Sequence, residues 1–100
     1  SEVMKKLRSV FTDDMDHCIF TGSPIVERHH ILGGALRKKS EKYGFVVPLH
    51  PTLHPNGVHF KPTPENKQID KKLKSMCQKY YEEHIGTHDE WMQEFYKNYL

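Results

Sequence analysis

Two stretches of the sequence decide the fold, IVERHHI at residues 25–31 and LHPTLHPNGVH at residues 49–59. The chain has eight histidines in 100 residues, and five of them fall within these two stretches. The first stretch has the apolar and β-branched character of a strand, and it ends in adjacent histidines. The second stretch carries His54 and His59 on either side of a Pro-Asn-Gly turn. Histidines gathered in this way indicate a common site.

The histidine pattern predicts a metal site. Adjacent histidines are hard to place in a core because successive strand residues point to opposite faces, and we expect the turn that follows to direct both toward one cleft. His54 can pair with either His50 or His59, and the third ligand is then His29 or His30. Imidazole suits Zn²⁺ and other transition metals, and three protein ligands with an open position are typical of a catalytic site. A spare imidazole remains as a general base near neutral pH.

Two other interpretations of the histidines stay open. They can be scattered over the surface, or they can form a closed structural zinc site. Cys18 begins the motif CIFTG, in which a zinc knuckle would need a second cysteine at Thr21. Because that cysteine is missing, we expect Cys18 to pack inside a hairpin, with metal ligation as the alternative.

The pattern along the chain predicts a single α+β domain over residues 1–100. Apolar spacing favours an N-terminal helix over Glu2–Phe11. Two strands, His17–Phe20 and Ile25–Ile31, flank the turn residues 21–24 and are expected to form a β-hairpin. A short apolar run follows at 44–49, where Pro48 confines pairing to a strand end or an edge.

Helical periodicity predicts two C-terminal helices. Thr63 is placed to cap a helix that has Pro64 at its first position and ends at about residue 85, before Gly86. Thr87 then begins a last helix with acidic residues in its first turn. Cys77 and the apolar stripe of the last helix are expected to be core. That stripe consists of Trp91, Met92, Phe95, Tyr96 and Tyr99.

The charge is unevenly distributed along the chain. The formal net charge is +2, but residues 81–100 hold one lysine and five acidic residues, against 14 basic and eight acidic residues in the remainder. A basic body suits a polyanion partner, and an ordinary solvated surface is the alternative. Two distant cysteines favour a reducing, intracellular compartment. With no apolar run long enough to span a bilayer and no signal peptide, we expect a cytoplasmic protein without a membrane partner.

These residues also carry a family likeness. The Cys-x-x-Thr-Gly start, the His-His-Ile strand end, the apolar strand and the later histidines resemble the HNH nucleases of the His-Me finger (ββα-metal) class. More narrowly, RKKSEKYG at 37–44, GVHF at 57–60 and KNYL at 97–100 resemble small phage-encoded HNH-like proteins that are similar to the recombination-enhancement (Ref, RecA-dependent) nucleases. The likeness covers residues 17–100 and implies a ββα-metal core.

The resemblance implies a metal-dependent endonuclease that hydrolyses DNA phosphodiester bonds and is linked to phage recombination or DNA processing. The general base falls on His30 and the metal ligands on His29, His54 and His59, with His50 as a candidate further ligand. One divalent ion is expected, Zn²⁺ as the bound ion and Mg²⁺ or Mn²⁺ as alternatives for activity. DNA, including single strands or recombination intermediates, and a recombinase filament are the expected partners, in the host cytoplasm.

The sequence departs from the HNH pattern at one position. The HNH asparagine is expected nine residues before His54, where Phe45 stands, so we expect a backbone carbonyl of Gly44 or Phe45 to orient the base. Six basic residues are candidates for phosphate contacts: Arg28, Arg37, Lys38, Lys39, Lys42 and Lys61.

Two rival functions remain at this stage. The first is a non-catalytic, zinc-stabilised nucleic-acid-binding module. The second is a protein-interaction domain, which exposed side chains at Trp91 or Phe95 would favour.

Overall fold

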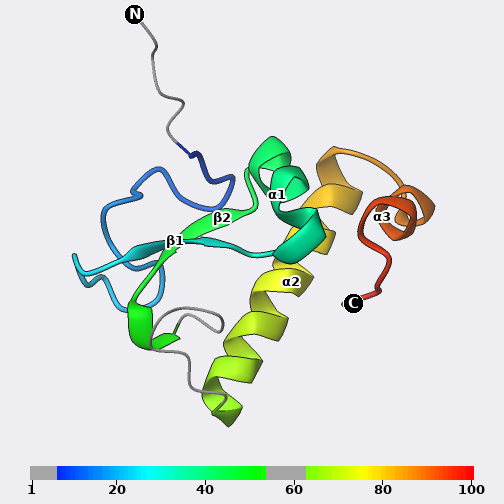
Figure 1. Ribbon diagram of the computed structural model, residues 1–100. Helices are drawn as coiled ribbons and strands as arrows, with labels where there is room; N and C mark the ends of the chain where they lie inside the picture. The colour runs from blue at the N-terminus through cyan, green and yellow to red at the C-terminus, as the bar shows by residue number, and fades with distance from the viewer. Residues whose placement is uncertain (1–6, 54–62) are drawn as a thin grey trace, which may run out of the picture.

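The structure is a computed structural model that describes residues 7–53 and 63–100. Its elements follow in the order β1 (Glu27–His30), η1 (Gly34–Leu36), α1 (Arg37–Tyr43), β2 (Val46–Leu49), η2 (Pro51–Leu53), α2 (Pro64–His84) and α3 (His88–Phe95). The two strands pair in antiparallel fashion beside the long helix α2, and α1 and α3 gather around the later part of α2 (Figure 1). The expected α+β class is confirmed.

The strand pair has a register that explains the proline within it. His29 pairs with Val47, Arg28 pairs with Pro48, and beyond the strand ends the Ile31 amide donates to the Phe45 carbonyl at 3.0 Å. Hydrogen-bonded and non-bonded pairs alternate in an antiparallel ladder, so Pro48 occupies a non-bonded position and needs no amide hydrogen there. Its carbonyl accepts the Ile19 amide at 3.0 Å. The prediction that Pro48 lies on an edge is confirmed.

The hairpin predicted between 17–20 and 25–31 is wrong, because β1 pairs with β2 instead. Residues Cys18 to Ser23 form a tight turn, in which the Gly22 amide donates to the Cys18 carbonyl and the Cys18 amide to the Ser23 carbonyl, both at 2.8 Å. These bonds occupy backbone groups that a strand ladder would need. Gly22 has a φ of 75°, which a residue with a side chain rarely adopts.

The predicted N-terminal helix also fails over its described part, residues 7–11, none of which is helical. The Val10 amide donates to the Gly44 carbonyl at 2.9 Å, and the Phe11 amide donates to the Ser9 hydroxyl at 3.0 Å. The segment therefore runs along the start of β2 and contributes Val10 and Phe11 to the edge of the core.

The helix α1 was not predicted, because its sequence RKKSEKY reads as a basic stretch. The buried Ser40 ties it to the chain just after β1. The Ser40 hydroxyl donates to the Leu32 carbonyl at 2.7 Å and accepts the Leu32 amide at 3.0 Å. Gly44 ends the helix in the left-handed conformation, and a Cβ there would lie 2.5 Å from the Arg8 guanidinium. This packing fixes α1 beside the two histidines of β1.

The two predicted C-terminal helices are confirmed as α2 and α3. The apolar stripe expected on the last helix is wrong at its end, because α3 stops at Phe95, so Tyr96 and Tyr99 lie after the helix, and Tyr96 is 70% exposed. The Thr63 hydroxyl accepts the Asn66 amide at 3.2 Å, with Pro64 at the first position of α2. Thr87 and Glu90 form a reciprocal capping box at the start of α3. Local capping signals thus set where these helices begin.

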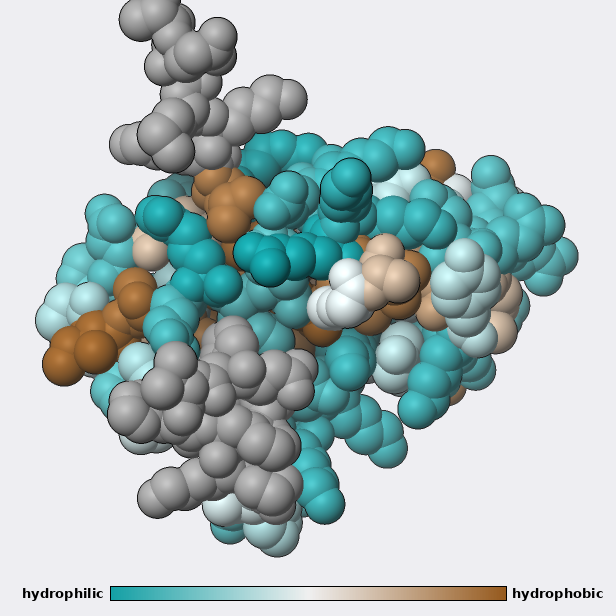
Figure 2. All heavy atoms as spheres, viewed as in Figure 1, coloured by the Kyte–Doolittle hydropathy of each residue, from teal (hydrophilic) through white to brown (hydrophobic). Residues whose placement is uncertain are grey.

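The core lies between the strand pair, α2 and α3. It contains Cys77, as expected, and both Trp91 and Phe95, so these two aromatic residues give no support to a protein-interaction surface. Large hydrophobic residues that remain exposed are scattered over a mostly hydrophilic surface (Figure 2). Within residues 7–53 and 63–100, no helix combines the length and apolar character that crossing a bilayer requires.

Candidate active site

The inner face of β1 carries an acidic residue and a histidine side by side. Glu27 and His29 are two positions apart on the strand and therefore share a face. Their register partners, Leu49 and Val47, are fully buried, and Val47 belongs to the core that packs on α2. His29 is only 2% exposed. The strand thus turns a carboxylate and an imidazole together toward the interior.

The Glu27 carboxylate has an unsatisfied oxygen. Its Oε1 atom is buried and has no hydrogen-bond partner among the residues that the structure describes. A buried carboxylate oxygen without hydrogen bonds or a cation is costly, so such atoms are found where a charge partner or a metal ion completes the site. Sequence reasoning missed Glu27, although its Glu-x-His spacing from His29 places both on one strand face.

His30 follows His29 at the last position of β1, and the alternation of side chains along a strand places it on the other face of the strand there. Its Nε2 lies 2.8 Å from Oε1 of Glu41 on α1, and the His30 side chain is 10% exposed. Because a carboxylate only accepts hydrogen bonds, Nε2 carries the proton in this pair. In the neutral imidazole Nδ1 then holds the lone pair that can accept a proton from water.

The described contact of the His30 ring is therefore with Glu41 and not with the backbone carbonyl of Gly44 or Phe45. The Gly44 carbonyl accepts the Val10 amide at 2.9 Å, and the Phe45 carbonyl accepts the Ile31 amide at 3.0 Å. Phe45 itself is fully buried in the core, where it packs among aromatic rings. The Glu41 carboxylate of α1 thus holds the His30 ring in place. Glu41 escaped the sequence prediction because α1 was not expected.

Comparisons with protein-family models, with curated proteins and with solved structures found no match for this chain.

Of the other residues predicted to bind the metal, only His50 lies in the described part of the chain. His54 and His59 fall outside it, as does Lys61, which was predicted to contact phosphate. His50 is half-buried, with its Nδ1 at 2.8 Å from the Thr52 hydroxyl. Among residues 7–53 and 63–100, no group of three or more His, Cys, Asp or Glu side chains is arranged to hold a metal ion.

The two ends of the stretch 54–62 are held close together by a described contact. Nδ2 of Asn66, in the first turn of α2, donates to the Thr52 carbonyl at 2.9 Å. Thr52 lies in η2, directly after β2, and the last residue of β2, Leu49, pairs with Glu27. The described residues on either side of the stretch, Thr52 and Asn66, are therefore in contact, and Thr52 follows the end of β2 that pairs with Glu27.

The described basic residues that were expected to contact phosphate belong to two elements, β1 and α1. Arg28 is exposed on the same face of β1 as His30, and Arg37, Lys38 and Lys42 are exposed on α1. Lys39 has a structural role instead. Its Nζ donates to the Glu94 carbonyl at 2.8 Å and lies 5.5 Å from the Tyr96 ring centroid.

Cys18 is buried, as expected, but in a turn rather than a hairpin. Its Sγ accepts the His50 amide at 3.3 Å. Burial raises the pKa of the Cys18 thiol, but hydrogen bonds from the Thr21 hydroxyl and from the amides of His50, Thr21 and Phe20 lower it more, so the pKa lies below its ordinary value. The Cys18 sulfur is thus surrounded by hydrogen-bond donors, which stabilise its thiolate form.

We expect iodoacetamide to label Cys18 before Cys77 in the folded protein. Burial raises the pKa of the Cys77 thiol well above its ordinary value, whereas hydrogen bonds hold that of Cys18 below it. The thiolate is the reacting species, so Cys18 has the larger reactive fraction at neutral pH. Peptide mass spectrometry after timed alkylation measures both rates, with the urea-unfolded chain as the control. Faster labelling of Cys77 would contradict the hydrogen-bond pattern.

Proposed function

We propose that this chain is a metal-dependent endonuclease of the HNH kind that hydrolyses DNA phosphodiester bonds, in phage recombination or DNA processing. The observation that carries the proposal is the set of side chains on β1. The buried His29 and the half-buried Glu27, whose Oε1 atom is buried, share one face, and His30 is held by Glu41 through its Nε2 atom. The antiparallel strand pair with α2 after it supports the proposal, and α1 is an additional helix between the two strands.

The residues present fit a divalent cation. Glu27 offers a buried carboxylate oxygen that lacks a hydrogen-bond partner within the described residues, and His29 offers an imidazole on the same strand face. A mixed carboxylate and imidazole set suits Zn²⁺, Mn²⁺ and, through the oxygen, Mg²⁺. His54 and His59 complete the proposed ligand set. When bound, the cation stabilises negative charge that develops on phosphate and leaving-group oxygens.

His30 acts as the general base in the proposed reaction, with the scissile phosphate at the end of β1, where His29 and His30 are adjacent on the two faces of the strand. Nδ1 accepts a proton from water while Glu41 stabilises the imidazolium through Nε2. The water oxygen bonds to phosphorus as the bond from phosphorus to the 3′-oxygen breaks, and that oxygen takes up a proton. The products are a 5′-phosphate and a 3′-hydroxyl. Arg28, on the same face as His30, holds a neighbouring phosphate.

The direct test of this function is plasmid cleavage. Purified protein is incubated with supercoiled DNA and Mg²⁺, Mn²⁺ or Zn²⁺, with and without a chelator. We expect nicked and linear products with at least one metal and none with the chelator, while the circular dichroism spectrum stays largely folded. Unfolding in the chelator, together with no cleavage in any metal, would favour the zinc-stabilised binding module instead.

Glu27→Gln is expected to weaken metal binding by at least about tenfold, because it removes the charge of a proposed ligand but keeps its size. Isothermal titration calorimetry with Mn²⁺ measures the affinity. The matched control is Glu83→Gln, the same change at an exposed position of α2. Equal affinities for Glu27→Gln, Glu83→Gln and the unchanged protein would remove Glu27 from the site.

A further inference from the structure

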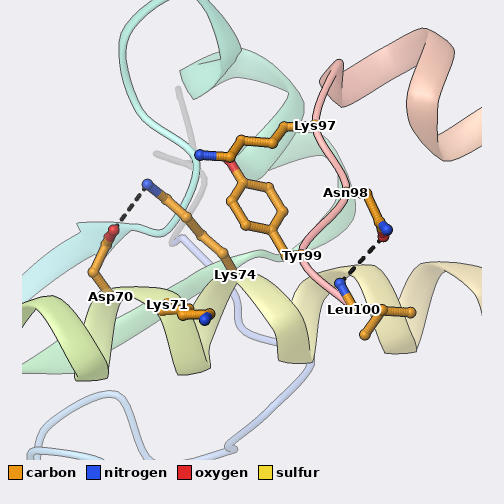
Figure 3. Close-up of a pocket in the computed structure, with 7 residues that line it drawn as sticks. All are labelled: Asp70, Lys71, Lys74, Lys97, Asn98, Tyr99 and Leu100. Carbon is orange, nitrogen blue, oxygen red and sulfur yellow. Dashed lines mark hydrogen bonds and ion pairs between the residues drawn. The ribbon is translucent and has the colours of Figure 1, made fainter.

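The residues after α3 fold back across α2 and enclose a pocket. Its volume is about 550 Å³. Figure 3 shows the Tyr99 ring in the middle of it, between side chains from α2 and from the tail. The pocket is lined by Asp70, Lys71 and Lys74 of α2 and by Lys97, Asn98, Tyr99 and Leu100 of the tail.

Buried contacts hold this tail in place. Gln78 of α2 is fully buried, and its side chain donates to Oδ1 of Asn98 at 2.8 Å and accepts the Tyr99 amide at 2.6 Å. Nε1 of Trp91 donates to the Lys97 carbonyl at 2.8 Å. The Tyr99 ring also packs edge-on against the Trp91 ring at 6.3 Å. The pocket is therefore formed before any ligand arrives, which reduces the entropy cost of binding.

The charged side chains of the pocket favour an anion. Three lysines line it, against one acidic side chain, Asp70, which pairs with Lys74 at 2.9 Å. Lys71 and Lys97 are exposed and have no such partner among the described residues. The pocket thus offers two ammonium groups to a ligand in addition to the paired one.

The positive pocket lies in the most acidic part of the sequence, and the structure explains why the two do not cancel. Three of the five acidic residues in 81–100 are used in internal contacts. Glu82 binds Gln78 and His88, Glu90 closes the capping box of α3, and Glu94 accepts two tyrosine hydroxyls. These three carboxylates therefore make contacts elsewhere in the structure, and none of them lines the pocket.

The aromatic ring of Tyr99, which lies among the lysines, indicates which class of anion the pocket would bind. Nζ of Lys97 lies 5.5 Å and Nζ of Lys74 lies 5.8 Å from the Tyr99 ring centroid. Three residues earlier, Tyr96 is 70% exposed, with Nζ of Lys39 at 5.5 Å from its ring. Proteins that bind single-stranded nucleic acids combine basic side chains for phosphates with aromatic rings for bases. An acidic peptide would use the lysines but would not need the rings.

We propose that the pocket around Tyr99 binds a single-stranded stretch of the nucleic-acid substrate, with phosphates on Lys71 and Lys97 and a base against the Tyr99 ring. The proposal rests on the proposed nuclease function and adds a substrate-binding site away from the β1 histidines. The exposed Tyr96 ring extends the same surface for a neighbouring nucleotide.

The test measures binding without cleavage. Fluorescence anisotropy follows a labelled oligothymidylate in the presence of a chelator, for Lys71→Gln, Lys97→Gln and their double variant. Each change is expected to lower the dependence of binding on salt by about 0.7 in log–log slope, and the double variant to weaken binding at least about tenfold. Lys79→Gln is the matched control, because Lys79 is exposed on α2 outside the pocket, and it should change affinity less than twofold.

A second variant tests the ring. Tyr99→Ala is expected to lower affinity about tenfold, which corresponds to about 1.4 kcal/mol of stacking. Tyr99→Phe keeps the ring and should bind as the unchanged protein does. Thermal melts show whether Tyr99→Ala stays folded, and the lysine variants decide the matter if it does not.

Three results would overturn the proposed binding site. The first is that the double lysine variant binds as tightly as Lys79→Gln, and the second is that the unchanged protein does not bind oligothymidylate. The third is that polyglutamate at equal charge displaces the oligonucleotide. Plasmid cleavage is scored separately. If the protein cleaves plasmid but the lysine variants bind the oligonucleotide normally, the proposed binding site is rejected and the nuclease function is not. If the pocket binds the oligonucleotide but no metal supports cleavage, the nuclease function is rejected and the binding site is not.

Discussion

His30→Ala is expected to abolish detectable plasmid cleavage while metal affinity and oligonucleotide affinity stay within about twofold of the unchanged protein. A positioned general base accelerates a reaction by about 10²–10⁴. His30 points away from the inner face where His29 and Glu27 lie, so its loss should leave the metal ligands in place. Cleavage assays, calorimetry and anisotropy on one preparation measure the three quantities.

Two further variants sharpen this result. His84→Ala makes the same change at an exposed histidine of α2 and should keep full activity. Glu41→Gln keeps a hydrogen bond to His30 but removes the charge that stabilises the imidazolium, so it should slow cleavage less than His30→Ala and leave KM nearly unchanged. Loss of metal binding in His30→Ala, with cleavage retained in part, would mean that His29 and His30 exchange roles.

Glu94→Gln is expected to lower the free energy of unfolding by about 2 kcal/mol and the Tm by about 10 °C. Glu94 of α3 accepts the hydroxyl of Tyr43 of α1 at 2.7 Å and the hydroxyl of Tyr81 of α2 at 2.5 Å. One carboxylate thus joins all three helices, and hydrogen bonds to a charged acceptor are about twice as strong as neutral ones. Urea titration at neutral pH measures the difference, with Glu83→Gln as the control.

The pH dependence of this contribution follows from the pKa of Glu94. Burial raises the pKa of the Glu94 carboxyl, but hydrogen bonds from Tyr81 and Tyr43 and the charges of Lys39 and Lys42 lower it more, so it lies below the ordinary value of 4.5. A depressed folded-state pKa stabilises the fold above the unfolded pKa and loses this effect as pH falls. The stability difference between the unchanged protein and Glu94→Gln should therefore shrink below about pH 4.5. A difference that stays constant down to pH 2 would contradict this.

The two tyrosines that donate to Glu94, Tyr43 and Tyr81, are affected by the same contact. Burial, followed by the hydrogen bond and the negative charge of Glu94, raises the pKa of Tyr43 to about 12. Both tyrosine hydroxyls therefore stay protonated donors across the range in which the protein would act, and the contact among the three helices is stable there.

The helices that could be predicted are those whose signals are local. Thr63 with Pro64, and Thr87 with Glu90, mark where α2 and α3 begin, and the observed caps use these same side chains. α1 was missed because its sequence is almost wholly polar. Its stability comes from tertiary contacts, chiefly Ser40 to the chain after β1, and no pattern within seven residues reveals them.

The strand pairing could not be predicted from neighbouring residues. The two segments around residues 21–24 look like a hairpin, but the partner of β1 lies beyond α1 and contains a proline. Only the register explains why Pro48 is tolerated, since its nitrogen occupies a position that makes no ladder bond. The histidines were proposed as site residues from the sequence, and Glu27 could have been added to them from its spacing to His29. Glu41 could not, because it is eleven residues from His30 on the helix that was missed.

The central claim is that the inner face of β1 holds a divalent cation, and anomalous X-ray scattering from crystals grown with Mn²⁺ or Zn²⁺ tests it most directly. We expect one strong anomalous peak bound by the His29 imidazole and the Glu27 carboxylate, with His54 and His59 completing the ligands. A crystal in which the ion lies elsewhere, or in which His29 and Glu27 make no bond to it, would contradict the account.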